Sequence, residues 1–243
     1  MTDPTVSERS PDVRPDSDFV AWNEAMVERY DIERYYERSH AIVRWVEARR
    51  LKSLVAFASA RPGDRVLEVG CGAGHVLERF PDTQRTGIDL SSGMLQRARR
   101  RLGGDVRLLR SQAERLPFSD GSFDIVLCTE VLEHTSDPSQ VIAELLRVAG
   151  PTGRVVVSIP SEKNIDRAKR VLRSIPLLRH FLRSLADTGN EWHLHDFDVR
   201  LLRQVSSRAH GEIARLHGVP SVLAPIRYVA LLRRAQANGR ARG

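Results

Sequence analysis

Long apolar stretches are missing from this sequence. No window of about 18 residues is both apolar and uncharged, which argues against a membrane-spanning helix. The first residues, MTDPTVSERSPDVRPDSD, are polar and lack the apolar centre of a signal peptide. We therefore expect a cytoplasmic protein.

Cysteine is also scarce, with only Cys71 and Cys128 among 243 residues. This pair offers neither a disulfide framework nor the ligand spacing of a zinc site. We expect two free thiols in a reducing compartment. The sequence contains no internal repeat that would indicate a repeat architecture.

The charge is moderately positive, with a formal net charge of +7 that rests mainly on arginine. Such a balance fits an anionic partner, but it also fits an ordinary solvated surface. Charge alone therefore leaves both interpretations open.

Composition divides the chain into six segments. The two ends are polar and predicted to be disordered, the segment after the first end shows helical spacing of apolar residues, and a basic, leucine-rich helical insert interrupts the second half. In order, these are the disordered segment 1–17, the N-terminal helices 18–60, the core 61–160, the insert 161–198, the C-terminal part of the sheet 199–233 and the disordered tail 234–243.

The core alternates short apolar runs with helical segments. The runs are RVLEVG, RTGIDL, DVRLLRSQ, FDIVLCTE and GRVVVSIP, and the segments between them include SSGMLQRARRRL and DPSQVIAELLRVA. Strands that alternate with helices predict a parallel sheet covered on both faces. Two further runs, GEIARLHGV and IRYVALLRR, are expected to complete this α/β sheet.

A glycine-rich turn follows the first predicted strand. Gly70, Gly72 and Gly74 stand where the strand leads into the next helix, which lets backbone approach a ligand closely. Asp89 ends the second strand, where a carboxylate can accept hydrogen bonds from both ribose hydroxyls. Both features indicate an adenosine-containing cofactor. NAD stays open as an alternative, although His75 stands where the dinucleotide fingerprint has glycine.

Four motifs in this order resemble those of class I S-adenosylmethionine-dependent methyltransferases of the type-11 kind. They are EVGCGAG (68–74), GIDLS (87–91), AERLPFSDGSFD (113–124) and EVLEH (130–134). The stretches CTEVLEH and HLHDF are most similar to ubiquinone-biosynthesis O-methyltransferases. The resemblance implies a doubly wound, Rossmann-like, seven-stranded sheet, mostly parallel, whose last strand is antiparallel.

The resemblance also implies which residues bind S-adenosylmethionine. The loop that holds the methionine part comprises Glu68, Gly70, Cys71, Gly72 and Gly74. Asp89 would bind the ribose, Leu90 and Met94 would form an apolar wall near the adenine, Gln112 and Ala113 would meet the adenine edge, and Glu130 would lie near the methionine end. Gln112 departs from the family, which usually has an acidic residue there, but a glutamine carbonyl oxygen can accept the same hydrogen bond.

Methyl transfer needs few protein groups, because the sulfonium methyl is already activated and the protein mainly aligns the reactants and excludes water. A base is required only when the acceptor arrives protonated. His193 and His134 are the candidate catalytic residues, with His195 as a third imidazole. Each histidine also has a structural alternative, as a helix cap or a surface residue.

A metal site is a second possibility for the EVLEH stretch. On one helical turn, Glu130, Glu133 and His134 would share a face and could hold a divalent ion. A structural or cofactor-side role is the preferred interpretation, and we expect no metal.

The expected function is methylation, with O-methylation preferred, of a small apolar or lipid-like molecule. Residues 166–186 combine leucines at helical spacing with basic residues, a pattern that fits a substrate lid with peripheral contact to a membrane. The same pattern also fits a helix pair that packs on the core and has a solvated basic face. A nucleic-acid partner is not expected, because no Asn/Asp-Pro-Pro-aromatic motif follows the fourth strand. A nucleic-acid methyltransferase and a non-catalytic cofactor-binding protein stay as alternatives.

Overall fold

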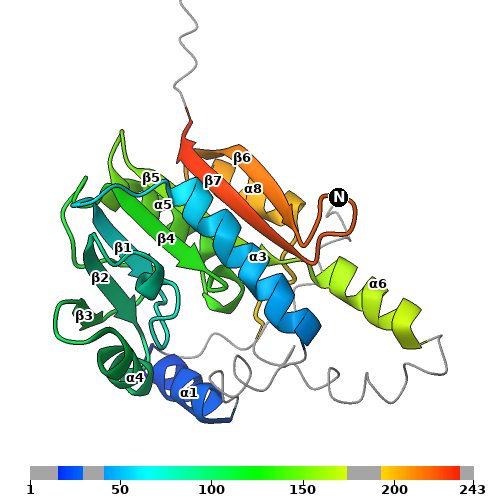
Figure 1. The fold of residues 1–243 in the computed structure, drawn as a ribbon, viewed down its shortest axis with the longest axis horizontal. Helices are drawn as coiled ribbons and strands as arrows, with labels where there is room; N and C mark the ends of the chain where they lie inside the picture. The colour runs from blue at the N-terminus through cyan, green and yellow to red at the C-terminus, as the bar shows by residue number, and fades with distance from the viewer. Residues whose placement is uncertain (1–15, 30–40, 174–192, 236–243) are drawn as a thin grey trace, which may run out of the picture.

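The computed structural model describes residues 16–29, 41–173 and 193–235. They form a seven-stranded sheet with helices on both faces (Figure 1), in the order β3-β2-β1-β4-β5-β7-β6. The strands are β1 (Arg65–Val69), β2 (Gln84–Asp89), β3 (Arg107–Arg110), β4 (Ile125–Thr129), β5 (Arg154–Pro160), β6 (Gly211–Val219) and β7 (Arg227–Arg234).

The sheet is parallel except for its last strand in the chain. Strands β1 to β5 pair in parallel, whereas β7 lies between β5 and β6 and is antiparallel to both. The doubly wound α/β fold with an antiparallel last strand is therefore confirmed. The strand order reverses between β1 and β4, and ligands of such sheets bind at this switch point, beyond the carboxyl ends of the strands.

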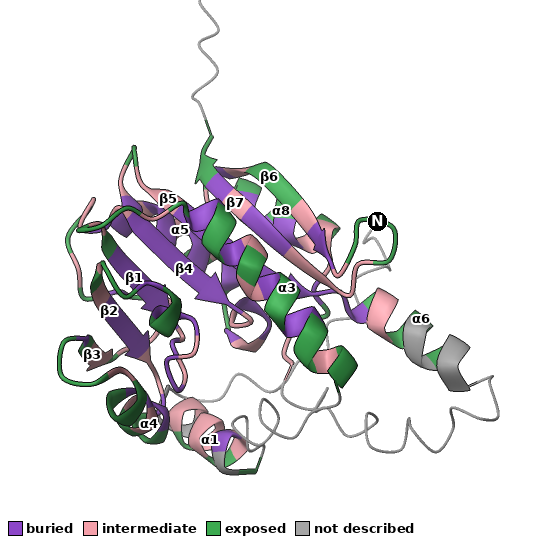
Figure 2. Cartoon of the chain, viewed as in Figure 1, coloured by how far each residue is buried: buried purple, intermediate pink, exposed green. Residues whose placement is uncertain are grey.

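Continuous apolar runs explain why the central strands are buried on both faces. In β4, Val126 and Cys128 belong to the core cluster on one face, and Ile125 and Leu127 to the cluster on the other. Helices α5 (Pro138–Ala149) and α8 (Val199–Arg208) cover the first face, and α3 (Ala41–Ala58) crosses the second. Figure 2 shows the strands between them as mostly buried. Both cysteines are buried free thiols.

Local signals set the ends of the helices. Helix α4 (Ser92–Leu102) begins where the Ser91 side chain accepts a hydrogen bond from the Met94 backbone N–H, and it ends at Gly103 with a positive φ. In the same way, Asp137 caps α5 and Asp198 caps α8. Among the described residues, the remaining helices are α1 (Asp16–Arg29), α6 (Glu162–Arg173) and the short 3₁₀ turns η1 (Leu77–Arg79) and η2 (Leu132–His134).

One expected helix is reduced to a single turn. The sequence predicted that the glycine loop leads into a helix, but the structure has only η1 there. Pro81 follows almost at once and β2 begins at Gln84, so the connection is too short for an α-helix. Residues 174–186 of the expected lid lie outside the described residues. Among the helices that are described, none is long and apolar enough to span a bilayer.

Candidate cofactor and active site

The glycine loop connects β1 to η1, and its three glycines meet different constraints. All three have positive φ values, of 70° for Gly70, 49° for Gly72 and 84° for Gly74. A Cβ on Gly70 would overlap Val131 Cγ2, and one on Gly74 would lie 2.7 Å from Leu102 Cδ1. A Cβ on Gly72 would meet nothing within 4 Å. Gly70 and Gly74 therefore permit close packing, whereas Gly72 presents bare backbone to open space.

Asp89, at the end of β2, fixes this loop. Its carboxylate accepts hydrogen bonds from the backbone N–H of Gly72 at 2.8 Å and from that of Ser91 at 2.9 Å. Burial raises the pKa of Asp89, and the two backbone N–H groups oppose that effect. Each carboxylate oxygen keeps a further lone pair for a ligand hydroxyl.

Glu68 lies buried just before the glycine loop. Its Oε1 is 3.4 Å from the donating hydroxyl of Thr129, and its Oε2 is buried without a hydrogen-bond partner. Burial raises the pKa of Glu68 to about 8, although Arg50, the Leu77 backbone N–H and Thr129 act in the opposite direction. Cys71 points inward, and burial raises the pKa of its thiol, so only its backbone can serve a ligand.

Helix α1 closes over the same region, which no sequence motif indicated. The Glu24 carboxylate accepts hydrogen bonds from the Ser91 hydroxyl at 2.6 Å and the Ser92 backbone N–H at 2.8 Å. Burial alone would raise the pKa of Glu24, but these bonds together outweigh it and lower that pKa below its ordinary value. Val27 of α1 also packs with Ala73 and with Met94 of α4. The structure therefore brings Met94 beside the glycine loop, under α1.

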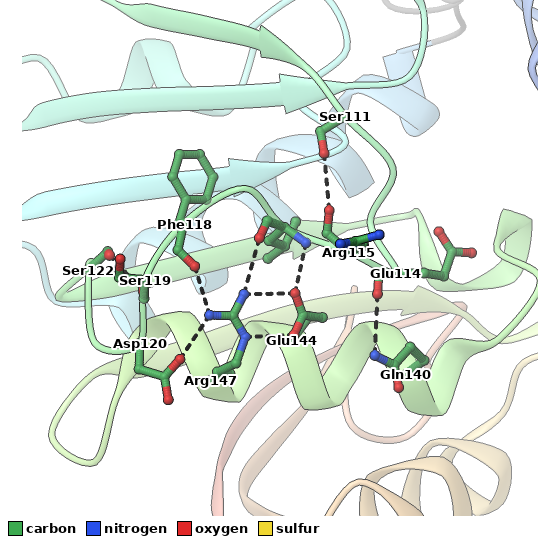
Figure 3. Close-up of polar contacts among 11 residues, drawn as sticks. Ser111, Glu114, Arg115, Phe118, Ser119, Asp120, Ser122, Gln140, Glu144 and Arg147 are labelled. Carbon is green, nitrogen blue, oxygen red and sulfur yellow. Dashed lines mark hydrogen bonds and ion pairs between the residues drawn. The ribbon is translucent and has the colours of Figure 1, made fainter.

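The loop that follows β3, which we expect to meet the adenine of the cofactor, is held in place by α5 (Figure 3). Arg147 donates to the carbonyls of Phe118 at 2.7 Å and Leu116 at 3.1 Å, and it pairs with Glu144 and Asp120. The Glu144 carboxylate accepts a hydrogen bond from the Leu116 backbone N–H at 2.7 Å. This network fixes the PFSD part of the third motif.

Gln112 and Ala113 precede that anchor and are half-buried. Ser111 directly precedes them, and its backbone N–H donates to the Asp89 carbonyl at 3.2 Å. This hydrogen bond keeps the segment that begins at Ser111 close to the end of β2. Leu90, also half-buried, offers its carbonyl to Arg110 at 2.9 Å. These residues therefore lie beside Asp89, where the resemblance expects the adenine.

Glu130 follows β4 in a left-handed conformation, with a φ of 54°. Its carboxylate accepts a hydrogen bond from the Ser158 hydroxyl at 2.9 Å and pairs with Arg227 at 2.5 Å. Arg227 also pairs with Glu47 of α3 at 2.8 Å, and Glu47 pairs with the buried Arg50. A non-glycine residue held at positive φ by such contacts is typical of a functional site.

The prediction that Glu130, Glu133 and His134 share one helical face is wrong. Glu130 precedes η2, its positive φ takes it out of that turn, and its carboxylate is engaged by Arg227. The structure instead brings Glu133 and His134 together with His193, with one ligand atom from each within 4.8 Å of the others. Burial and the neighbouring Glu130 raise the pKa of Glu133.

His193 carries a carboxylate partner that no local motif indicates. Its Nδ1 lies 2.5 Å from Oε1 of Glu162, a buried residue at the start of α6. The rings of His193 and His134 are in edge contact, 5.0 Å between centroids. The separation of 31 residues between His193 and Glu162 explains why sequence reasoning missed the pair.

His195 lies apart from this pair. Its Nε2 is hydrogen-bonded to the Thr135 carbonyl at 2.9 Å. The backbone N–H groups of Leu194 and His195 both donate to the Glu133 carbonyl, which pins this segment beside η2. His195 therefore buttresses the segment that presents His193.

Comparisons with known proteins agree with this geometry. The family described as "Methyltransferase domain" matches residues 67–157, from β1 to β5. Residues 67–157 therefore match a methyltransferase domain. This match supports S-adenosylmethionine as the expected cofactor.

Two relatives take part in quinone biosynthesis by name. The demethylmenaquinone methyltransferase of Renibacterium salmoninarum is 34% identical over 156 residues, which cover 63% of this chain and 62% of the relative. The ubiquinone biosynthesis O-methyltransferase of Hahella chejuensis is 36% identical over 141 residues, which cover 55% of this chain and 57% of the relative. The chain thus spans about three-fifths of the length of these relatives. They support the likeness to quinone-biosynthesis enzymes.

A solved structure shows the same fold over most of the chain. Magnesium protoporphyrin IX methyltransferase from Synechocystis has a TM-score of 0.64 and 16% identity, with 91% of this chain and 100% of that chain covered. This likeness establishes the Rossmann-like architecture.

The methyltransferase domain has the features that the cofactor requires. Gly72 leaves open space beside its backbone, and Asp89 beside it has lone pairs for hydroxyl donors. The orphaned Oε2 of Glu68 provides an acceptor for a cationic or N–H group at the start of the loop. All three features fit an adenosyl ligand that carries a methionine ammonium.

Proposed function

We propose that the protein transfers a methyl group from S-adenosylmethionine to a hydroxyl of a small, apolar or lipid-like molecule. The observation that carries this proposal is the His193–Glu162 pair at the carboxyl end of the sheet, because a hydroxyl acceptor needs a base. The names of the two quinone-biosynthesis relatives support the class of acceptor.

On this proposal, each residue named from the sequence binds a different part of the cofactor. Glu68 and the backbone of Gly70, Cys71, Gly72 and Gly74 take the methionine part, and Asp89 takes the ribose. Leu90, Met94, Gln112 and Ala113 surround the adenine, and Glu130 lies at the methionine end. The bound cofactor supplies an activated methyl group.

The His193–Glu162 pair can take up the proton of the acceptor. When Nδ1–H of His193 donates to the Glu162 carboxylate, the neutral ring keeps Nε2 as a proton acceptor. Glu162 also favours the imidazolium that forms when the proton arrives, as in other carboxylate–imidazole pairs. Glu162 is thus a positioning residue, and His193 is the base. His134, in edge contact with His193, limits the movement of its ring.

Water exclusion is the second task of the site. Helix α1 packs on Ala73 and Met94, and α6 begins directly after β5, so both helices lie beside the proposed pocket. Ordered walls of this kind keep the reactants aligned and reduce hydrolysis of the cofactor.

An acceptor screen tests the proposal. The purified protein is incubated with trideuteromethyl-labelled S-adenosylmethionine and matched phenols that differ in the length of an isoprenoid tail. Each phenol is supplied with its hydroxyl free or blocked, and the products are identified by mass spectrometry. We expect label on free hydroxyls and faster turnover with a tail. Label on ring carbon or nitrogen would contradict O-methylation, and label only on tail-free, polar acceptors would contradict the apolar substrate class.

A further inference from the structure

Four exposed apolar side chains gather at one end of the molecule. Ile42 is 57% exposed and Trp45 51% exposed, both in the first two turns of α3. Val222 is 75% exposed and Leu223 99% exposed, both in the loop between β6 and β7. These four residues are called the apolar patch. Single exposed apolar residues are ordinary, but four large ones on two adjoining elements need an explanation.

Hydrogen bonds join the two elements that carry the apolar patch. Arg49 of α3 donates from Nε to the Pro220 carbonyl at 2.9 Å, and its guanidinium lies 5.4 Å from the centre of the Trp45 ring. The other side of the loop is tied to α6, where Asn164 donates to the Pro225 carbonyl at 2.8 Å. The first three turns of α3, the loop and the start of α6 therefore lie next to one another and contribute to one surface.

This surface lies at the ligand-binding end of the sheet. The loop leads into β7, whose first residue, Arg227, pairs with Pro160 at the carboxyl end of β5. Helix α6 begins two residues after Pro160 and carries Glu162, the partner of His193. The start of α6 beside the start of β7 is visible in Figure 1. The apolar patch thus flanks the proposed entrance for the acceptor.

The charged side chains around the apolar patch are mainly basic. Among the described side chains on the first three turns of α3 and on α6, Asp166 is the one exposed acidic residue. The exposed basic residues on the same turns are Arg44, Arg49, Arg167 and Arg170, together with Lys163, which pairs with Asp198 at 2.6 Å. Exposed apolar side chains bordered by basic ones fit a surface that is apolar inside and anionic at its head groups.

We propose that the apolar patch docks on an anionic lipid bilayer, with Trp45, Val222 and Leu223 entering the head-group region. Tryptophan is favoured at this depth because its ring is apolar and its indole N–H is polar. The basic side chains of α3 and α6 then contact anionic head groups. A protein partner would require a defined complementary surface, whereas the fully exposed Leu223 at a loop tip has the form of a membrane-inserting residue.

This docking site differs from the one that the sequence analysis expected. The leucines of residues 174–186 lie outside the described residues, whereas the apolar patch is built from α3 and the β6–β7 loop. The docking proposal does not depend on the proposed function, because vesicle binding is measured without turnover. If both hold, a lipid-tailed acceptor reaches the site directly from the bilayer.

Vesicle sedimentation of the full chain tests the docking. We compare wild type with the double variant Val222→Ser/Leu223→Ser, using vesicles of phosphatidylcholine alone and with one-third phosphatidylglycerol. A matched control, Val55→Ser/Leu216→Ser, changes two apolar residues that are 37% exposed and lie elsewhere on α3 and on β6. We expect wild type and control to bind the anionic vesicles, the patch variant to bind at least tenfold more weakly, and added salt to weaken all binding.

A fluorescence readout reports on Trp45 itself. In a Trp22→Phe/Trp192→Phe background, Trp45 is the sole tryptophan of the chain, which has three. We expect its emission to shift to shorter wavelength on anionic vesicles. Absence of vesicle binding by folded wild type, equal loss in the control variant, or an unshifted Trp45 emission would overturn the proposal. Concentration-dependent self-association that the patch variant abolishes, without vesicle binding, would overturn it in favour of a second copy of the chain.

Discussion

Asp89 and Gly72 are joined by a hydrogen bond of 2.8 Å, in which the Gly72 backbone N–H donates to the carboxylate. The group proposed to bind the ribose therefore also fixes the glycine loop that meets the methionine part. Cofactor affinity and loop order should change together when Asp89 is altered.

Replacing Asp89 should weaken cofactor binding. Asp89→Ala removes charge-assisted hydrogen bonds that are each worth roughly 1.5–3 kcal/mol, so affinity should fall at least tenfold. Asp89→Asn keeps a carbonyl that can accept from Gly72 but loses the charge, and it should lie between wild type and Asp89→Ala. Titration calorimetry with S-adenosylhomocysteine measures the three affinities. Equal affinities would rule out Asp89 as the ribose ligand.

His193 and Glu162 should act as one unit. Loss of a general base typically costs about a hundredfold or more in rate, so His193→Gln should lower kcat by that order with little change in cofactor affinity. Glu162→Gln should cost less, and the double variant should be no slower than His193→Gln alone. His195→Gln is the matched control, because the His195 ring bonds the Thr135 carbonyl and should leave turnover near wild type. Additive losses at His193 and Glu162 would show that they act separately.

Glu68 should make the protein less stable as pH rises. Its pKa is raised by burial to about 8 in the folded state, against about 4.3 in an unfolded chain. The contribution of Glu68 to the free energy of unfolding is therefore complete below its pKa in the unfolded chain. It is lost as pH rises through about 8, and the free energy of unfolding falls by up to about 1.4 kcal/mol per pH unit over this range. Glu68→Gln removes this dependence. Chemical unfolding between about pH 5 and about pH 9 should show a flatter profile for the variant, and parallel profiles would exclude this role.

Activity should not require a tightly bound metal. Glu133, His134 and His193 form a candidate ligand set among the described residues, but Nδ1 of His193 is already bonded to Glu162. We expect dialysis against a chelator to leave turnover unchanged. Turnover that is lost with chelator and returns with magnesium would assign the cluster to a metal.

The fold was predictable because its signals are local. Apolar runs that alternate with helical segments predicted the strands, and caps such as Ser91 and Asp137 mark the helix starts. The expected helix after Gly74 failed because Pro81 and the early start of β2 leave no room for it.

The candidate site was less accessible to sequence reasoning because its contacts join distant segments. Glu24 reaches Ser91 from 67 residues away, and Arg227 reaches Glu130 from 97 residues away. No spacing rule covers such pairs, since the tertiary fold alone brings them together. The single face expected for Glu130, Glu133 and His134 failed because the positive φ of Glu130 interrupts the helical geometry.

The most direct test of the account is the stoichiometry of methyl transfer. One reaction with labelled S-adenosylmethionine and the best phenolic acceptor is analysed by mass spectrometry for both S-adenosylhomocysteine and the methylated product. The account predicts equal amounts of the two, a large decrease of both with His193→Gln, and neither when the acceptor hydroxyl is blocked. Tight binding of S-adenosylmethionine without S-adenosylhomocysteine from any acceptor would contradict it and indicate a non-catalytic cofactor-binding protein.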